Sequence, residues 1–121
     1  MFRITIEDDA IVAEVPARVF QDTVVQFVYH RHGMRVDTAA ATEILKRIGS
    51  AYPLPCELGM IFRGVILTSE EVRDALRPVL GNLLNLLRTA PHNRDIRLVG
   101  DGADLRGLTL LIAEETGRYI R

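Results

Sequence analysis

The sequence is short of the residues and patterns that mark several large classes of protein. Its 121 residues include a single cysteine, Cys56, which excludes an internal disulfide framework and a metal cluster built from cysteines. Fifteen basic and sixteen acidic residues leave a formal charge of −1, so the composition does not indicate a general nucleic-acid binder or anionic-membrane binder. No apolar run approaches the roughly 20 residues that a membrane-spanning helix needs.

What remains is the composition of an ordinary globular domain, with 48% hydrophobic and 26% charged residues. This length supports one hydrophobic core, and we expect a single domain over residues 1–121. No signal-peptide or lipidation pattern opens the sequence, so we expect a cytoplasmic protein without direct membrane insertion. Cys56 is expected to be a small, semi-buried apolar residue.

The chain begins with the pattern of a β-hairpin. Residues 2–7, FRITIE, alternate apolar and polar side chains, which is typical of a half-buried strand. After a turn-like EDDA, residues 11–15, IVAEV, resume the alternation, and Pro16 ends the second strand.

Two helices are expected next, over residues 20–32 with Gly33 after the last turn, and from Asp37 to Gly49. A third helix starts at the capping box TSEEV, in which the Thr68 hydroxyl caps the helix and Glu71 reaches back. Pro78 and Gly81 lie inside this helix and are expected to bend it. Its apolar stripe consists of Val72, Ala75, Leu76, Val79, Leu80, Leu83, Leu84 and Leu87.

The remaining elements are short. MIFRGVIL predicts a hairpin that turns at residues 63–64, and IRLV, residues 96–99, predicts a strand covered on both faces. A last helix is expected over residues 104–116, closed by Gly117, before a terminal strand in RYIR. The order ββααββαβαβ indicates an α/β or α+β protein with a mixed sheet.

Three stretches carry a resemblance to one family: ILKRIGSAYP at 44–53, LTSEEVRDAL at 67–76 and ADLRGLTLLIAEETG at 103–117. In order and spacing they resemble the second lobe of the bacterial actin MreB family, within the actin-like ATPase superfamily. The resemblance covers roughly residues 3–121. It implies a trimmed actin-like (ribonuclease H-like) α/β fold, with a shortened small subdomain around residues 34–67.

The same resemblance implies a loss of the nucleotide machinery. Family members clamp ATP and magnesium between two lobes, and both of the phosphate loops that do so have no counterpart in this sequence. The family's adenosine turn, three glycines, corresponds here to Gly100, Asp101 and Gly102, so the middle residue brings a carboxylate that repels phosphates and loses a glycine's freedom at positive φ. We expect this degenerate cofactor-binding turn to be non-functional.

Two positions that reach the ribose in the family correspond to Thr42 and Leu45, and Leu45 cannot donate a hydrogen bond. Glu43 and Lys46 are adjacent, but one residue along a helix turns a side chain by about 100°. No Walker-type phosphate motif replaces the missing loops. We therefore expect a chain that is not an enzyme, with no catalytic residues, metal or cofactor.

Other polar groups are expected to be structural. His30 and His32 are two residues apart on a helix and point to different sides, so they do not form a metal pair. His92 has no evident acid–base partner, and the acidic turn at residues 7–9 is expected to be a solvated hairpin tip. The leucines at positions 83, 84, 86 and 87 form a stripe wider than one helix face requires; core packing is the first interpretation, and a partner surface is the alternative.

The resemblance also implies that a strand is missing from the middle of the sheet, between the first hairpin and IRLV. FRITIE could pair directly with IRLV, a second copy could join edge to edge or contribute a strand, or a partner could donate one. We expect closure within the chain, with a homodimer across an exposed edge or the leucine-rich helix as a further possibility.

The functional hypothesis is a non-catalytic MreB-like interaction module of the bacterial cytoskeleton or cell-shape machinery. Its expected partner is a full-length MreB or another cell-shape protein, not nucleic acid. The alternative hypothesis is the nucleotide-binding half of a split actin-like ATPase, completed by another chain.

Overall fold

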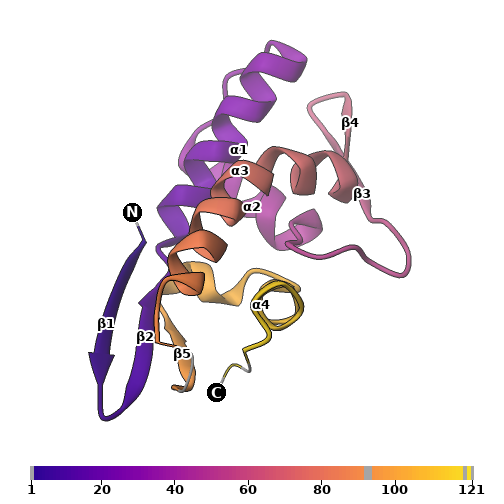
Figure 1. Ribbon diagram of the computed structural model, residues 1–121. Coiled ribbons are helices and arrows are strands. Elements are labelled where there is room, and N and C mark those ends of the chain that lie inside the picture. Colours follow the sequence, from indigo (N-terminus) through magenta and orange to yellow (C-terminus); the bar gives the residue numbers. More distant parts are fainter. Residues whose placement is uncertain (1, 92–93, 119, 121) are drawn as a thin grey trace.

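The computed structural model places a small mixed sheet at one end of a helical layer, with a separate hairpin at the other end (Figure 1). It describes residues 2–91, 94–118 and 120. The elements follow the order β1 Arg3–Glu7, β2 Ala10–Glu14, α1 Ala17–His32, α2 Thr38–Ile48, β3 Gly59–Phe62, β4 Val65–Thr68, α3 Ser69–Arg88, β5 Ile96–Val99, the 3-10 helix η1 Asp101–Asp104 and α4 Leu108–Thr116.

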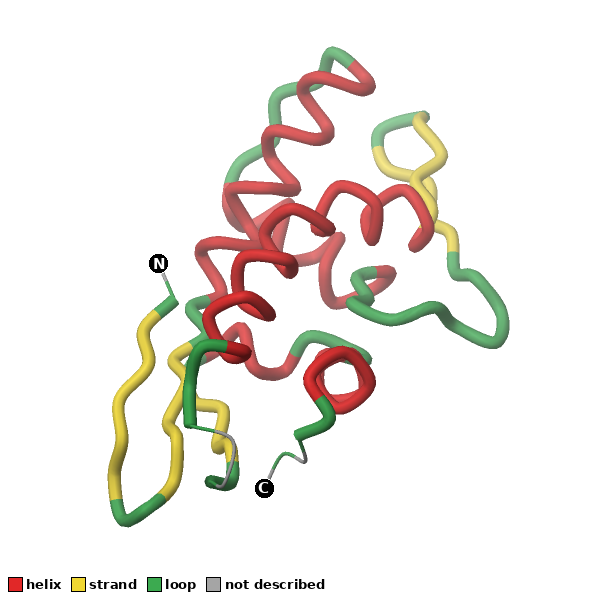
Figure 2. Tube along the Cα trace, in the orientation of Figure 1, coloured by secondary structure: helices red, strands yellow, loops and turns green. Residues whose placement is uncertain are grey.

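The first sheet has the strand order β1-β2-β5, with β1 antiparallel and β5 parallel to β2 (Figure 2). The chain therefore closes the gap by itself, but through β2: the expectation that FRITIE pairs with IRLV is wrong. The physical reason lies in the two strands. β2 buries four consecutive residues, 10–13, as a central strand must, whereas β1 exposes its charged residues and also Ile6.

β5 is also less enclosed than expected. Ile96 is buried, but Arg97 is exposed and the last two residues of the strand are only half-buried. Among the described residues, the neighbours of β5 are β2 and an isolated parallel bridge to Ile120. That bridge is all that the structure describes of the expected terminal strand, since Tyr119 and Arg121 lie outside the described residues.

The helices follow their local signals closely. α1 begins at Ala17, three residues earlier than expected, and ends at His32, where Gly33 follows in the left-handed conformation. Asp37 caps α2 by accepting a hydrogen bond from the amide of Ala40. Thr68 caps α3 as expected, although Glu71 reaches back to the Thr68 hydroxyl and not to a backbone amide.

The last helix is shorter than expected. α4 begins at Leu108, because Gly107 at φ 77° interrupts the chain after the 3-10 turn of η1. α3, in contrast, runs as one element through Pro78.

The core lies between the inner face of the first sheet and the helices. The inner face supplies Ile11, Ala13 and Ile96, and the helices supply the leucine stripe of α3. Core packing is therefore confirmed for Leu83, Leu84 and Leu87, which are buried together with Leu76 and Leu80, whereas Leu86 is only half-buried. None of the helices in the described ranges is long and apolar enough to cross a membrane.

Candidate functional site

A cleft of about 500 Å³ lies where the resemblance places the adenosine turn. The first turns of α1 form one wall, the last turns of α2 form another, and η1 with the following loop forms the third. The lining residues are Ala17, Phe20, Gln21, Thr42, Leu45, Lys46, Gly49, Asp101, Gly102, Asp104, Leu105 and Arg106.

The glycines of the turn are required by packing. Gly100 has φ 96°, and a Cβ built on it would lie 2.7 Å from the carbonyl oxygen of Val15. A Cβ on Gly102 would meet the same oxygen at 2.7 Å. The positive φ thus falls on Gly100 and not on Asp101, so the expected strain at the substituted position is wrong. Asp101 is exposed and lines the cleft.

Three amides at this turn and the following residues are used inside the fold. The Gly102 amide donates to the Val15 carbonyl at 2.8 Å, and the Ala103 amide donates to the Gly100 carbonyl at 3.1 Å. The Leu105 amide donates to the Gly102 carbonyl at 3.2 Å. Phosphate binding at a glycine turn needs amides that point at the ligand, and these three do not.

On the α2 side of the cleft, the position of Lys46 differs from what the sequence predicts. Thr42 and Leu45 line the cleft, and so does Lys46, which we expected to be turned away. The Thr42 hydroxyl accepts a hydrogen bond from the Gln21 amide group at 2.9 Å and donates to the Thr38 carbonyl. Lys46 therefore brings a cation to a cleft whose opposite side carries two carboxylates, at Asp101 and Asp104.

Arg106 adds a second cation that is already engaged. Its guanidinium donates to the carbonyls of Gly49 at 3.3 Å and Lys46 at 3.4 Å, at the end of α2. Cationic donors stabilise a helix C-terminus, where carbonyls lack partners. Arg106 thus holds the loop before α4 against the end of α2. Lys46 is the other cationic side chain in the lining of the cleft.

The stretch IGSAYP, which carries the most specific part of the resemblance, also packs against this loop. The Ala51 amide donates to the Arg106 carbonyl at 2.8 Å, and the Ser50 hydroxyl donates to the Tyr52 carbonyl at 2.6 Å. The Tyr52 hydroxyl donates to the Glu114 carboxylate, which raises the pKa of Tyr52. The motif therefore joins α2 to α4.

The histidines take structural positions. His32 Nε2 lies 3.7 Å from a carboxylate oxygen of Glu71, and Arg31 Nε lies 3.9 Å from the same oxygen, while His30 is exposed. These contacts join the end of α1 to the start of α3. Within the residues that the structure describes, no three metal-ligating side chains gather at one place. His92 lies outside those residues.

The acidic turn makes ion pairs with the segment around β5. Asp9 lies 2.8 Å from Arg94, and Glu7 lies 3.5 Å from Arg97. Asp8 and Asp9 both have positive φ, at 48° and 64°, as a two-residue type I′ hairpin turn requires. Two of the carboxylates at this tip therefore face arginines.

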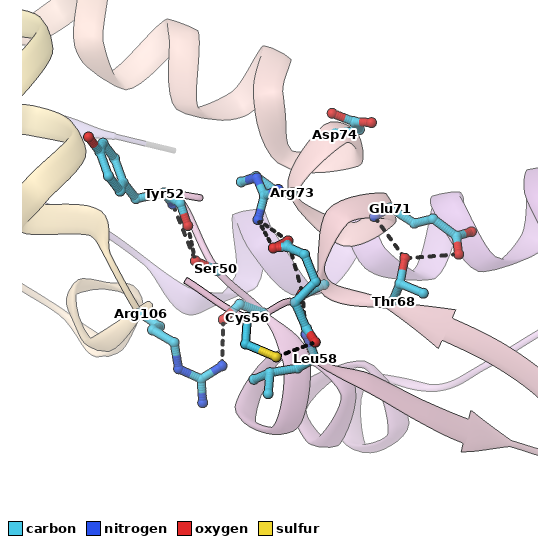
Figure 3. Close-up of polar contacts among 12 residues, drawn as sticks. Ser50, Tyr52, Cys56, Leu58, Thr68, Glu71, Arg73, Asp74 and Arg106 are labelled. Atoms are coloured by element: carbon cyan, nitrogen blue, oxygen red, sulfur yellow. Dashed lines mark hydrogen bonds and ion pairs between the residues drawn. The ribbon is translucent and has the colours of Figure 1, made fainter. Parts of the chain in front are cut away.

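One polar cluster, around Glu57, has no signal in the sequence pattern. Glu57 accepts hydrogen bonds from Arg73 at 2.7 Å and from the Ser69 hydroxyl at 3.2 Å, and Arg73 holds the pKa of Glu57 below its usual range (Figure 3). Ser69 and Arg73 are four residues apart on α3, a spacing that puts them on one face. Nothing local pointed to Glu57, which comes from a loop together with Cys56; that cysteine is exposed, not semi-buried.

The depressed pKa of Glu57 predicts an acid-dependent loss of stability. Its contribution is complete above the unfolded-state pKa of about 4.3 and is lost as the pH falls through the lower folded-state pKa. We expect the melting temperature of Glu57→Gln to lie below that of the native protein at pH 7 and to converge with it in acid. Melts from pH 2 to 7 test this, with Asp74→Asn, an exposed pair with Arg77, as the control. A difference that persists unchanged at pH 2 would contradict the prediction.

The chain is similar in sequence to known bacterial proteins, although no family model matches it. The cell shape-determining protein MreB of Escherichia coli K12 is 29% identical over 119 residues, covering 81% of this chain and 34% of MreB. MreB of Salmonella typhimurium gives the same values. The chain therefore spans about a third of the curated relatives it matches.

Solved structures agree on the fold. MreB5 of Spiroplasma citri bound to ADP superposes with a TM-score of 0.69 at 20% identity, over 99% of this chain and 47% of that one. A MamK filament subunit gives 0.68 at 14% identity, over 98% and 50%. The expected actin-like α/β fold is confirmed.

Proposed function

Because this chain is related to the MreB bacterial actins over about a third of their length, we propose that it is a non-catalytic actin-like module that binds another actin-like chain. Its partner is a full-length MreB or another protein of the cell-shape machinery. MamK, which shares the fold, assembles into a filament, and this module would act on such an assembly by occupying one subunit contact.

The observation that carries the proposal is the state of the glycine turn. Its amides at Gly102, Ala103 and Leu105 bond within the fold, and Asp101 and Asp104 add negative charge to the cleft. Hydrolysis of ATP needs oriented phosphate donors and a metal-holding carboxylate. The cleft presents the carboxylates of Asp101 and Asp104 opposite Lys46, while Arg106 is engaged with backbone carbonyls. This balance of charge disfavours the binding of a triphosphate.

The surface that we assign to the partner is the outer face of the β3–β4 hairpin. Ile61 and Ile66 are cross-strand neighbours and are 73% and 67% exposed. The hairpin stands apart from the first sheet, on the far side of the helices (Figure 1). Large apolar side chains that are exposed side by side are typical of surfaces that a second protein covers.

A pelleting experiment with polymerised full-length MreB tests the proposal. We expect the native chain to pellet with the polymer or to change the amount that pellets. Ile61→Glu/Ile66→Glu should abolish the effect, because two carboxylates cannot be buried in an apolar contact. Leu110→Glu is the matched control, since Leu110 is 60% exposed on α4, away from the hairpin. Unchanged pelleting and no association with the native chain would overturn the proposal.

The cleft supports a second candidate, a nucleotide-binding half of a split ATPase. Lys46 lines the cleft beside the apolar side chains of Phe20 and Leu45, which could accommodate a base. Under the main proposal, calorimetry with ATP and magnesium at millimolar concentration gives no binding heat. A saturable heat that Lys46→Ala removes would favour the split ATPase instead.

A further inference from the structure

The outer edge of β1 is open. β1 is the first strand in the order β1-β2-β5, and it lies at the margin of the molecule in Figures 1 and 2. In the described part of the chain, no strand pairs with its outer side. Proline, lysine and bulges commonly protect such edges, and Arg3–Glu7 contains no proline or lysine and pairs with β2 in unbroken register.

The hairpin register fixes which backbone groups face outward. Glu7 and Ala10 flank the two-residue type I′ turn, and the pair next to such a turn is hydrogen-bonded. Hydrogen-bonded and non-hydrogen-bonded pairs alternate along an antiparallel ladder. Arg3, Thr5 and Glu7 therefore direct their backbone groups to β2, while Ile4 and Ile6 direct theirs to the open edge.

The edge is complementary to itself. When RITIE is laid antiparallel on a second RITIE with Thr5 opposite Thr5, each Ile4 lies opposite Ile6 of the other copy. These are the residues whose amides and carbonyls point outward, so the two copies can exchange ladder hydrogen bonds in this register. The same register sets Arg3 opposite Glu7 of the second copy.

The side chains agree on both faces of the sheet. Ile4 and Ile6 share the inner face with their partners Ala13 and Ile11, yet Ile6 is 54% exposed. Ile4 of the second copy would cover it. An apolar side chain directly opposite Ile6 on a neighbouring strand would remove apolar surface from water, which stabilises the pairing.

On the outer face, charges of opposite sign face one another. Arg3 lies 3.9 Å from Glu14, and Glu7 lies 3.5 Å from Arg97 in the same chain. With Arg3 opposite Glu7 of the second copy, Arg3 lies between two carboxylates, Glu14 of its own chain and Glu7 of the second copy, while each Glu7 also keeps Arg97 of its own chain, which reaches it diagonally across β2. Opposite charges in directly facing positions favour one register over its neighbours, and like charges disfavour others.

We propose that two copies of this chain pair through β1 in antiparallel register about Thr5, forming a twofold dimer with a continuous six-stranded sheet. The other exposed hairpin offers a weaker match, because β3, Gly59–Phe62, and β4, Val65–Thr68, contain no charge that would fix a register. The proposal uses a different surface from the β3–β4 face and does not depend on the function proposed above.

Charge reversal provides a sharp test by sedimentation velocity over a wide range of protein concentration. Arg3→Glu alone and Glu7→Arg alone each place like charges opposite one another twice in the dimer. Each is expected to weaken dimerisation about tenfold or more. Mixing the two variants in equal amounts restores opposite charges at both positions, so a heterodimer of nearly native affinity is expected, even though each variant still lacks one of its ion pairs within the chain.

Hydrogen exchange locates the contact independently. The amides of Ile4 and Ile6 should gain protection with rising protein concentration, whereas the amide of Thr5, already turned to β2, should not change. A native chain that stays monomeric at millimolar concentration, variants that dimerise as tightly as the native chain, a mixture that fails to dimerise, or protection that appears at β3–β4 instead would each overturn the proposal.

Discussion

Gly100→Ala is expected to lower the free energy of unfolding by about 3 kcal/mol, because it combines two costs at one position. The residue has φ 96°, where a side chain is strained, and the new Cβ would lie 2.7 Å from the Val15 carbonyl oxygen and 3.1 Å from the Val15 carbonyl carbon. Those neighbours are backbone atoms at the end of the central strand, so they cannot move aside without disturbing the sheet. Chemical denaturation measures the loss.

Two other glycines separate the cost of the backbone strain from the cost of the close contact with Val15. Gly33 has φ 66° with nothing within 4 Å of its Cβ position, so Gly33→Ala isolates the strain and should cost about 1 kcal/mol. Gly102 has the close approach to Val15 without a positive φ, and its alanine variant should fall between the two. An alanine at Gly100 that costs no more than one at Gly33 would contradict the packing role that we assign to the turn.

Leu83→Ala is expected to cost about 2–5 kcal/mol, the range for emptying a leucine site in a close-packed core. Leu83 is 1% exposed and belongs to the cluster that joins α3 to the sheet. The loss should be visible in thermal and chemical unfolding of the isolated chain, without any partner present.

Leu110→Ala is the comparison, because this leucine lies on the solvent side of α4 and its truncation should change stability by about 0.5 kcal/mol or less. A Leu83→Ala variant that unfolds at the same denaturant concentration as the native chain would contradict this contribution of the leucine stripe to the stability of the core.

Local signals predicted most of the helices. Asp37, Thr68, Gly33 and Gly117 act at helix ends, where a single side chain or a glycine conformation is sufficient to fix a boundary. The hairpin turn at residues 63–64 is predictable for the same reason, since both residues adopt positive φ. The boundary of α4 was harder to predict, because Gly107 had to be recognised as an interruption inside an apolar periodic stretch.

Long-range pairing was the part that sequence reasoning could not predict. FRITIE and IVAEV both have strand patterns, and only burial of consecutive residues 10–13 decides that β2, not β1, occupies the centre of the sheet. The same limit applies to the cleft. The angle of Lys46 on an isolated helix predicts a side chain turned away from the cleft, but the opening of the cleft depends on how α1 and η1 pack against α2.

The parallel pairing of β2 with β5 also constrains how the chain acquires its shape. Ile11 pairs with Ile96, and Asp9 contacts Arg94 across a separation of 85 residues. Contacts so distant in the chain slow folding, since a large loop must close before they form. During synthesis on the ribosome β1 and β2 emerge long before β5, so the edge of β2 that receives β5 stays unpaired until the last quarter of the chain has been made.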